Sequence, residues 1–428
     1  MNDGWRTQRA EPVQVGDAAG VARPPQTRTE RRRERERQER LRRRGRLAFA
    51  TIVVAFVVVI AGIAYPMRHT LGLSRLFGGQ STADWSSGST GPQLIVHITG
   101  TNNSDFAQTL VDAGVVRSAG AFNDAAGDQP ISAGFYELNK HMSASDCVKL
   151  LTDPARTHRV GMLSVPPGAQ LDDKHGIDDK VTQGILSMIS DATAYTLNGT
   201  PHRVTVDALV KAAAAASTAD LQIPDWATTA VQAKTGDHRR IEGLIAPGSW
   251  DQVDPQASPT AILASLISAS AAKFQAEGLL DVSTAGAAKL DPYEALVSAS
   301  VVEREVNQAA YYPKVARVIL NRLARKQRLE MDSTVNYTAA VTNIDVAGEN
   351  LSKPTDWNTY VKYGLPATPI GAVGSDALAA TEAPEPGPWL YFVTIDKSGT
   401  TLFTSQFSVH EHNRELACAN KLLTTGCK

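Results

Sequence analysis

The stretch DPYEALVSASVVEREV, residues 291–306, predicts the helix on which the fold is built. Asp291 can cap a helix, Pro292 suits the first helical position, and Glu294 can bond back to the cap. The eight residues that follow are all apolar or small, a pattern typical of a helix with little exposed surface. We therefore expect a largely buried helix that runs from Pro292 to about Val306 and ends in charged residues.

The helical phase separates the two glutamates at the end of this helix. At about 100° per residue, Glu303 shares one side with four apolar or small residues, Leu296, Ala299, Ser300 and Val306. Glu305 points about half a turn away from Leu296 and is expected to be solvated or ion-paired, as structural support. A carboxyl group against apolar neighbours has a raised pKa and can donate a proton near neutral pH. The alternative for Glu303 is an ordinary helix-end charge that pairs with Arg304 or Arg322.

Helices and strands segregate along the rest of the chain rather than alternate. Ser104 and Ser143 are the expected caps of the first two helices. A chain in which helices and antiparallel strands segregate belongs to the α+β class. Strands are expected at 94–100, at 134–139 and at the start of 163–168, and 389–395 with 400–405 is expected to form a hairpin. Helices are expected at 104–116, at 143–153, over most of 169–275 and from about Ser408 to Leu423.

The charge is uneven along the chain. Residues 27–46 carry a net charge of +7, whereas residues 66–428 carry −8. Between them, residues 47–65 are 19 uncharged, mostly apolar residues. As a helix they would span roughly 28 Å, about the hydrocarbon thickness of a bilayer. Basic residues mark the cytoplasmic side of such a helix, so residues 66–428 are expected outside the cell membrane. The acidic remainder argues against a nucleic-acid-binding domain.

Five regions follow from these patterns. Residues 1–46 are expected to be a disordered basic cytoplasmic segment, and 47–65 a single transmembrane helix rather than a cleaved signal peptide. Residues 66–92 are expected to be a flexible linker rich in Gly and Ser. Residues 93–157 have the pattern of a small β-α-α-β module, and 158–428 form a larger α+β domain.

Several sequence blocks occur in an order that is typical of one family. ALVSASVVEREVNQAAYYPKVARVILNRLARKQRLEMDSTVNY, residues 295–337, follows the pattern SIVE-x-E, PKVA-x-V-x-x-NRL and L-x-x-DPTV-x-Y. Around it lie ISAGFYELNKHMSASDCVKLL (131–151), IEGLIAPGSW (241–250), DWNTY (356–360), GLPATPIGAVGSDALAA (364–380), LYFV (390–393) and EHN (411–413). On these blocks, over about residues 94–415, the chain resembles the MltG/YceG family of membrane-anchored endolytic murein transglycosylases.

The resemblance implies a fold and a reaction. The small module is implied to be LysM-like, and the larger domain to be a YceG-like catalytic domain. The implied reaction cleaves the MurNAc–GlcNAc β-1,4 bond of peptidoglycan without water and leaves a 1,6-anhydroMurNAc end. Glu303, the first glutamate of SIVE-x-E, would act as general acid and then as base. No second carboxylate nucleophile is required, unlike in hydrolases. We expect no cofactor, and no His or Cys cluster has metal-ligand spacing.

Other matching residues are candidates for substrate binding, each with a structural alternative. Asn321 and Arg322 either bind sugar or support the fold from a helix surface. Asp332 and Thr334 either line the glycan groove or cap a short helix. The remaining candidates are Asn358, Tyr360, Glu411, His412 and Asn413. Each of them either binds sugar or packs within the domain. The chain departs from the family at Ser333, which replaces a proline, at Glu330, which replaces a glutamine, and at Pro167, which replaces a glutamate.

Two further expectations concern cysteines and partners. Cys418 and Cys427 can form a disulfide in an oxidising exterior, worth about 2–3 kcal/mol in chain entropy, whereas Cys147 is expected to be a buried thiol. The implied partners are glycan strands and, beside them, penicillin-binding proteins or other glycan synthases. The competing hypothesis is a non-catalytic, membrane-anchored peptidoglycan-binding protein. A pyridoxal-phosphate lyase, a third hypothesis, does not suit a chain with an extracytoplasmic domain.

Overall fold

The computed structural model describes residues 81–176, 180–281, 289–339, 341–342, 349–423 and 427. The basic segment 1–46, the apolar segment 47–65 and the first part of the linker lie outside these residues. Within the described part of the chain, no helix has both the length and the apolar character needed to cross a membrane.

The N-terminal module has two helices between two antiparallel strands. Its elements are β1 (Gln93–Ile98), α2 (Asn103–Asp112), α3 (Ala119–Ala126), β2 (Gly134–Asn139) and α4 (Ala144–Leu151), and β2 also pairs with β3 (Arg159–Val160). The predicted cap Ser143 accepts a hydrogen bond from the backbone of Asp146. The predicted cap Ser104 is wrong, because the extended residue Asn102 caps α2 instead. The module has its own apolar core, which includes the buried thiol Cys147.

The remaining described residues are mainly helical, with small sheets. The helices are α5 (Ile185–Ala192), α6 (Val206–Ala215), α7 (Asp225–Ala233), η2 (His238–Ile241), α8 (Pro259–Ala276), η3 (Leu279–Asp281), α9 (Pro292–Glu305), η4 (Ala309–Tyr311), α10 (Tyr312–Ala324), α11 (Asp332–Asn336), α12 (Glu349–Ser352), α13 (Ser375–Glu382) and α14 (Phe407–Ala419). The strands are β4 (Leu163–Val165), β5 (Lys174–Gly176), β6 (Val181–Thr182), β7 (Tyr195–Leu197), β8 (Thr200–His202), β9 (Gly248–Trp250), β10 (Val341–Thr342), β11 (Tyr391–Thr394) and β12 (Thr401–Thr404).

The strands confirm the α+β class. The pairs β4–β9, β5–β6, β7–β8 and β11–β12 are antiparallel, and only the short pair β5–β10 is parallel among the described strands. The predicted hairpin is present, with Tyr391 opposite Thr404 and Thr394 opposite Thr401. The turn-rich block at 241–250 ends in β9, so the chain there pairs with β4 instead of forming only a loop.

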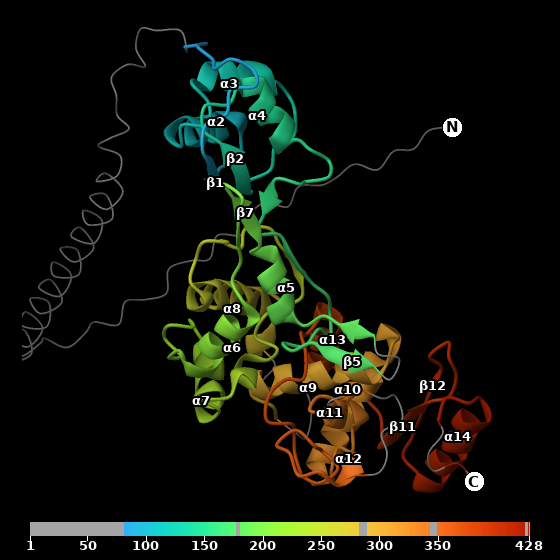
Figure 1. Ribbon diagram of the computed structural model, residues 1–428. Coiled ribbons are helices and arrows are strands. Elements are labelled where there is room, and N and C mark those ends of the chain that lie inside the picture. The colour runs from blue at the N-terminus through green and yellow to red at the C-terminus, as the bar shows by residue number, and fades with distance from the viewer. Residues whose placement is uncertain are drawn as a thin grey trace, which may run out of the picture. The chain divides into compact units, whose positions relative to one another are not determined.

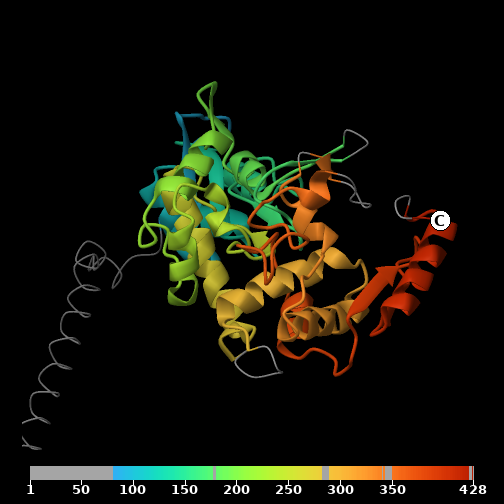
Figure 2. The same ribbon diagram turned by 90° about the horizontal axis from the view of Figure 1, so that it is seen from below.

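Helix α9 is the centre of the larger domain. Asp291 and Glu294 form the predicted capping box, and the helix ends at Glu305, one residue before the predicted end. Every residue from Ala295 to Val302 is buried, so the helix is enclosed on nearly all sides. Helices α10, α11 and α13 pack against it, and Figures 1 and 2 show α10 and α13 beside it. The end of α9 is therefore held by elements from distant parts of the sequence.

The C-terminal elements form a separate layer in which α14 packs on the β11–β12 hairpin, drawn in red in Figures 1 and 2. Helix α14 ends at Ala419, before the predicted end at Leu423. A disulfide joins Cys418 to Cys427, as the spacing of these cysteines suggested. The bond ties the chain after α14 back to the last turn of that helix.

Candidate active site

Glu303 lies in the last turn of α9, and both oxygens of its carboxyl group have hydrogen-bond donors. The hydroxyl of Tyr312, the first residue of α10, donates to Oε1 at 3.0 Å. The backbone N–H of Gly374, the N-cap of α13, donates to Oε2 at 3.1 Å. The side chain is half-buried. Three helices therefore meet at this one carboxyl group.

The side of α9 that carries Glu303 also holds the segment before α13. Ser300, one turn earlier, accepts a hydrogen bond from the backbone N–H of Ile370 at 3.0 Å. The four residues predicted to share this side, Leu296, Ala299, Ser300 and Val306, are all buried. Ser300 and Glu303 both bond to the segment 370–374, so the two residues share one side of the helix, as the helical phase predicted.

A turn after β4 also lies beside Glu303 and is bonded to the segment before α13. The backbone N–H of Gly168 donates to the carbonyl of Ala372 at 2.8 Å, and that of Ala372 donates to the carbonyl of Ala169 at 2.7 Å. Gly168 has a φ of +73°, which glycine adopts without strain. A methyl group placed on Gly374 would lie 2.9 Å from Oε2 of Glu303 and 3.5 Å from Cβ of Pro167. The carboxyl group thus fits against backbone that has no room for a side chain.

Burial and neighbouring groups together raise the pKa of Glu303. Loss of water around the carboxyl is the largest cause, and the hydrogen bonds from Tyr312 and Gly374 act in the opposite direction. The charge of Asp376, in the first turn of α13, raises the pKa further, and that of Arg304 lowers it. No residue in the described part of the chain forms an ion pair with Glu303. The alternative of a paired helix-end charge is therefore not what the structure shows.

Glu305 differs from its prediction. Its carboxyl is not solvated, because Oε1 accepts hydrogen bonds from the backbone N–H of Ser333, at 3.1 Å, and from the hydroxyl of the same residue. Burial, with the charge of Asp332, raises the pKa of Glu305 to about 7. Ser333 stands where the family has proline, which has no N–H to donate. This departure supplies the bonds that tie α9 to α11.

Asn321 and Arg322 make contacts with the main chain. The amide of Asn321 donates to the carbonyls of Gly387 and Trp389 at 3.0 and 2.8 Å. The guanidinium of Arg322 is buried and donates to the carbonyls of Leu390 and Leu329 at 2.7 and 2.6 Å. These are the contacts of the fold-supporting alternative, and sugar binding by this pair stays a prediction. The extra acid Glu330 is exposed and lies 3.5 Å from Arg322 instead of beside Glu303.

Four other candidates gather around α11. The hydroxyl of Tyr360 donates to Asp332 Oδ1 at 2.5 Å, and Asn358 accepts from the backbone N–H of Tyr360 at 2.9 Å. Thr334 is fully buried and its hydroxyl donates to the carbonyl of Met331. The capping alternative is wrong, because Met331 is the N-cap and no side chain caps α11. Asp332 and Tyr360 are adjacent to Glu305 through Ser333, and their binding of sugar stays a prediction.

Glu411, His412 and Asn413 lie in the middle of α14. Glu411 and His412 are exposed, and His412 lies 3.6 Å from Glu415 on the same helix. Asn413 is buried. The helix packs on β11 and β12, and the structure gives these three residues no contact with Glu303 among the described residues. The structure thus does not bring them to the site around α9.

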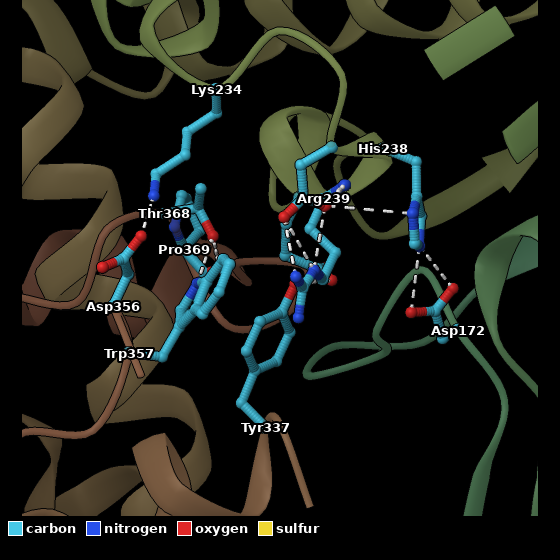
Figure 3. A network of polar contacts seen from close by, with 11 residues as sticks. Asp172, Lys234, His238, Arg239, Tyr337, Asp356, Trp357, Thr368 and Pro369 are labelled. Atoms are coloured by element: carbon cyan, nitrogen blue, oxygen red, sulfur yellow. Dashed lines mark hydrogen bonds and ion pairs between the residues drawn. The ribbon is translucent and has the colours of Figure 1, made fainter. Parts of the chain in front are cut away.

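A second polar network lies near the site, and Figure 3 shows its side chains. His238 is bonded to the Asp172 carboxylate at 2.8 Å, and this bond raises the pKa of His238. The Trp357 ring contacts two cations, with Arg239 Cζ at 4.2 Å and Lys234 Nζ at 5.4 Å from its centre. The network joins η2 to the chain before β5 and to the DWNTY block.

Glu242 lies in this part of the domain and is fully buried. Its Oε2 accepts from the backbone N–H of Leu171 at 3.1 Å and from the Tyr337 hydroxyl at 2.9 Å. Burial raises the pKa of Glu242 to about 7. Glu242 thus bonds the loop after β4 to the end of α11.

Several residues of the site were not among those predicted from the sequence. Tyr312, Gly374 and Asp376 surround Glu303, and Glu242 is the buried acid of the second network. Each lies inside a block that resembles the family, so its position in that block was the available signal. Nothing in local periodicity marks these residues, because their contacts come from segments far apart in the chain.

Comparisons with known proteins agree with the resemblance. The family model described as "YceG-like family" matches residues 96–416. The chain is 28% identical to an endolytic murein transglycosylase of Bacillus subtilis (strain 168) over 327 residues. This alignment covers 75% of this chain and 84% of that protein. It is 24% identical over 329 residues to one of Streptococcus pneumoniae (strain ATCC BAA-255 / R6), over 73% of this chain and 56% of that protein. The chain therefore matches little more than half the length of the pneumococcal relative. A crystal structure of a yceG-like protein from Listeria monocytogenes aligns with a TM-score of 0.48 at 24% identity, over 76% of this chain and 99% of that one.

Proposed function

The chain belongs to the YceG-like family, and on this premise we propose that it is an endolytic murein transglycosylase in which Glu303 is the catalytic acid and base. The observation that carries the proposal is the half-buried Glu303 carboxyl, held by Tyr312 and Gly374 and with a raised pKa. A carboxyl group with a raised pKa keeps its proton to higher pH than a free carboxyl group, and its carboxylate can accept a proton back.

The first step needs a proton donor beside the glycosidic oxygen. Glu303 donates its proton to the oxygen that links MurNAc C1 to GlcNAc, and the C1–O bond breaks. The Tyr312 hydroxyl can donate or accept a hydrogen bond, so it can remain on Oε1 in both protonation states. The Gly374 N–H can only donate, and it holds Oε2 while the carboxyl group loses its proton.

The second step needs a base at the same place. The Glu303 carboxylate removes the proton from the C6 hydroxyl of the same MurNAc residue, and that oxygen forms the new bond to C1. The product ends in 1,6-anhydroMurNAc, and Glu303 has recovered its proton. One carboxyl group thus serves both steps, and water takes no part. The acids Glu305 and Glu242 are bound to protein donors and have no assigned step.

Product analysis tests the proposal. Purified full-length protein in detergent should release fragments from long glycan strands whose new ends are anhydroMurNAc, identified by mass spectrometry as one water lighter than the hydrolysis product. An internal cut should shorten long strands before small fragments accumulate. Reducing MurNAc ends would instead indicate a hydrolase. Binding of strands with no product of either kind would favour a non-catalytic peptidoglycan-binding protein.

The pH dependence should report the hydrogen bond from Tyr312. This bond lowers the pKa of Glu303, so Tyr312→Phe should raise that pKa. Because the acid acts while protonated, kcat/KM should fall as pH rises through the pKa of Glu303 in the free enzyme. In the variant this fall should move to higher pH, with kcat reduced by no more than about tenfold. The neighbouring Tyr311→Phe is the control, since Tyr311 packs on Phe403, and its profile should match wild type. A fall that stays in place or moves to lower pH would count against this role of Tyr312.

The same proposal extends to location and partners. The charge pattern of residues 27–65 supports a single membrane anchor with a cytoplasmic N-terminus and an extracytoplasmic catalytic domain. The antiparallel pair β1–β2 and the module's own apolar core support a LysM-like unit at 93–157. A membrane-anchored strand-cutting enzyme is placed to act beside glycan synthases such as penicillin-binding proteins. The orientation is tested with single cysteines introduced before and after residues 47–65. A membrane-impermeant thiol reagent then labels only the cysteines outside the membrane.

A further inference from the structure

Arg304 follows Glu303 in the chain, and both side chains border the same turn. The guanidinium donates from Nη1 to the carbonyl of Gly168 at 2.8 Å. A methyl group placed on Gly168 would lie 3.7 Å from Cγ of Glu303 and 3.8 Å from Nη1 of Arg304. The turn at Gly168 thus lies beside both side chains, and the Arg304 guanidinium is bonded to it.

Most of the hydrogen-bonding capacity of Arg304 is unused. A guanidinium has five N–H donors, and the bond to Gly168 uses one of them. The residue is exposed, and within the described ranges of the chain it has no ion pair and no second hydrogen bond. Two other arginines of the domain differ in this respect, because Arg239 is paired with Asp237 and Arg322 has several acceptors.

The charges around Arg304 leave its positive charge only partly balanced. Although Arg304 has exposed surface, neighbouring groups displace part of the water around its guanidinium and lower its pKa. The charges of Glu242, Glu305 and Glu303 raise the pKa, and an arginine stays protonated in proteins. Each of these three acids accepts hydrogen bonds from other groups, and among the described residues none forms an ion pair with Arg304. Lys174, whose Nζ donates to the carbonyl of Tyr337, adds a second positive charge within electrostatic range of Arg304.

We propose that Arg304 forms a binding subsite for a carboxylate of the glycan strand next to the bond that Glu303 cleaves. This inference rests on the proposed function, because it names a further group of the same substrate. A guanidinium with a free fork of N–H groups suits a carboxylate better than a neutral sugar hydroxyl. In a glycan strand, carboxylates occur on the stem peptides, or on the lactyl group of MurNAc where the stem has been removed.

A binding experiment separates this contact from catalysis. In the Glu303→Gln background, which should not cut the substrate, the affinity of full-length protein in detergent for purified glycan strands is measured with and without Arg304→Gln. Strands with stem peptides are compared with the same strands after their carboxyl groups have been converted to neutral amides. The Arg304→Gln change should weaken binding to the charged strands by about tenfold more than to the neutral ones. Higher salt should reduce this difference.

Two variants control for a structural effect. Arg304→Lys keeps the charge but not the fork, so it should retain part of the preference for charged strands. Arg317→Gln removes another guanidinium that donates to main-chain carbonyls, those of Glu385 and Pro384, and should weaken both kinds of strand equally or not at all. The proposal is overturned if Arg304→Gln weakens charged and neutral strands to the same extent, because the loss would then come from the Gly168 contact.

A third substrate identifies the source of the carboxylate. Strands whose stems have been removed by an amidase keep only the lactyl carboxylates. A tenfold effect on these strands assigns the contact to the lactyl group, and an effect confined to stem-bearing strands assigns it to the stem. The proposed function is judged separately by the products of the wild type. Anhydro products without carboxylate-dependent binding would overturn this inference alone, whereas carboxylate-dependent binding without such products would overturn the proposed function alone.

Discussion

Glu303→Gln is expected to lower kcat for the release of anhydro-ended products by about 10³-fold, the range of a lost general acid and base. Glutamine has nearly the same shape, and its side-chain oxygen can still accept the hydrogen bond from Gly374. It cannot donate the proton to the leaving oxygen and take one back from the C6 hydroxyl. Initial rates measured by chromatography of the products would give the change.

The stability of the Glu303→Gln variant shows whether the fold is intact. Because the folded-state pKa of Glu303 is raised, the wild type loses stability as pH rises from the ordinary carboxyl pKa through the folded value. The variant lacks this loss, so thermal unfolding should occur at an equal or higher temperature than in wild type at alkaline pH. Glu305→Gln, two residues away, is the matched control and should keep most of the activity. Full activity of Glu303→Gln, with loss in Glu305→Gln, would reassign the acid.

Gly374→Ala is expected to lower activity by about 10²-fold without unfolding the protein. Gly374 has φ −76° and ψ 157°, which alanine adopts freely, so the backbone does not oppose the change. The new methyl group would lie 2.9 Å from Oε2 of Glu303 and must displace the carboxyl group. A misplacement of about 1 Å at a reacting group can cost this much in rate.

The adjacent residue supplies the control for the Gly374 variant. Ser375 is exposed at the first position of α13, so Ser375→Ala should leave activity within about twofold of wild type. Circular dichroism of both variants during heating would confirm that each is folded. If Gly374→Ala is as active as wild type, the carboxyl group does not work from the position in which Gly374 holds it.

Much of the fold could be predicted because its signals are local. The capping box of Asp291 and Glu294 lies within one turn, and the burial of residues 295–302 follows from their composition. The hairpin of β11 and β12 follows from two short strands around a turn. Helical phase also placed Glu303 on the side of Leu296 and Ser300, and Ser300 and Glu303 bond to the same segment, 370–374.

Other features could not be predicted, because they depend on packing between distant segments. Helix α3 was missed, since its apolar face is short and is recognised only against the module core. Glu305 was expected in solvent, yet it bonds to Ser333, which lies 28 residues further along the chain. Asn321 and Arg322 were candidates for sugar binding, but the structure turns both toward carbonyl groups of the segment before β11.

The sequence by itself therefore determined the helix that carries Glu303, the side on which it lies and the α+β class. Only the tertiary structure decided what surrounds the carboxyl group. Its donor Gly374 is 71 residues away, and the turn at Gly168 is 136 residues from Arg304. The physical reason is that periodicity and capping depend on neighbours within a few residues. The pKa of an acid, in contrast, depends on the water that packing removes and on the donors that packing brings near.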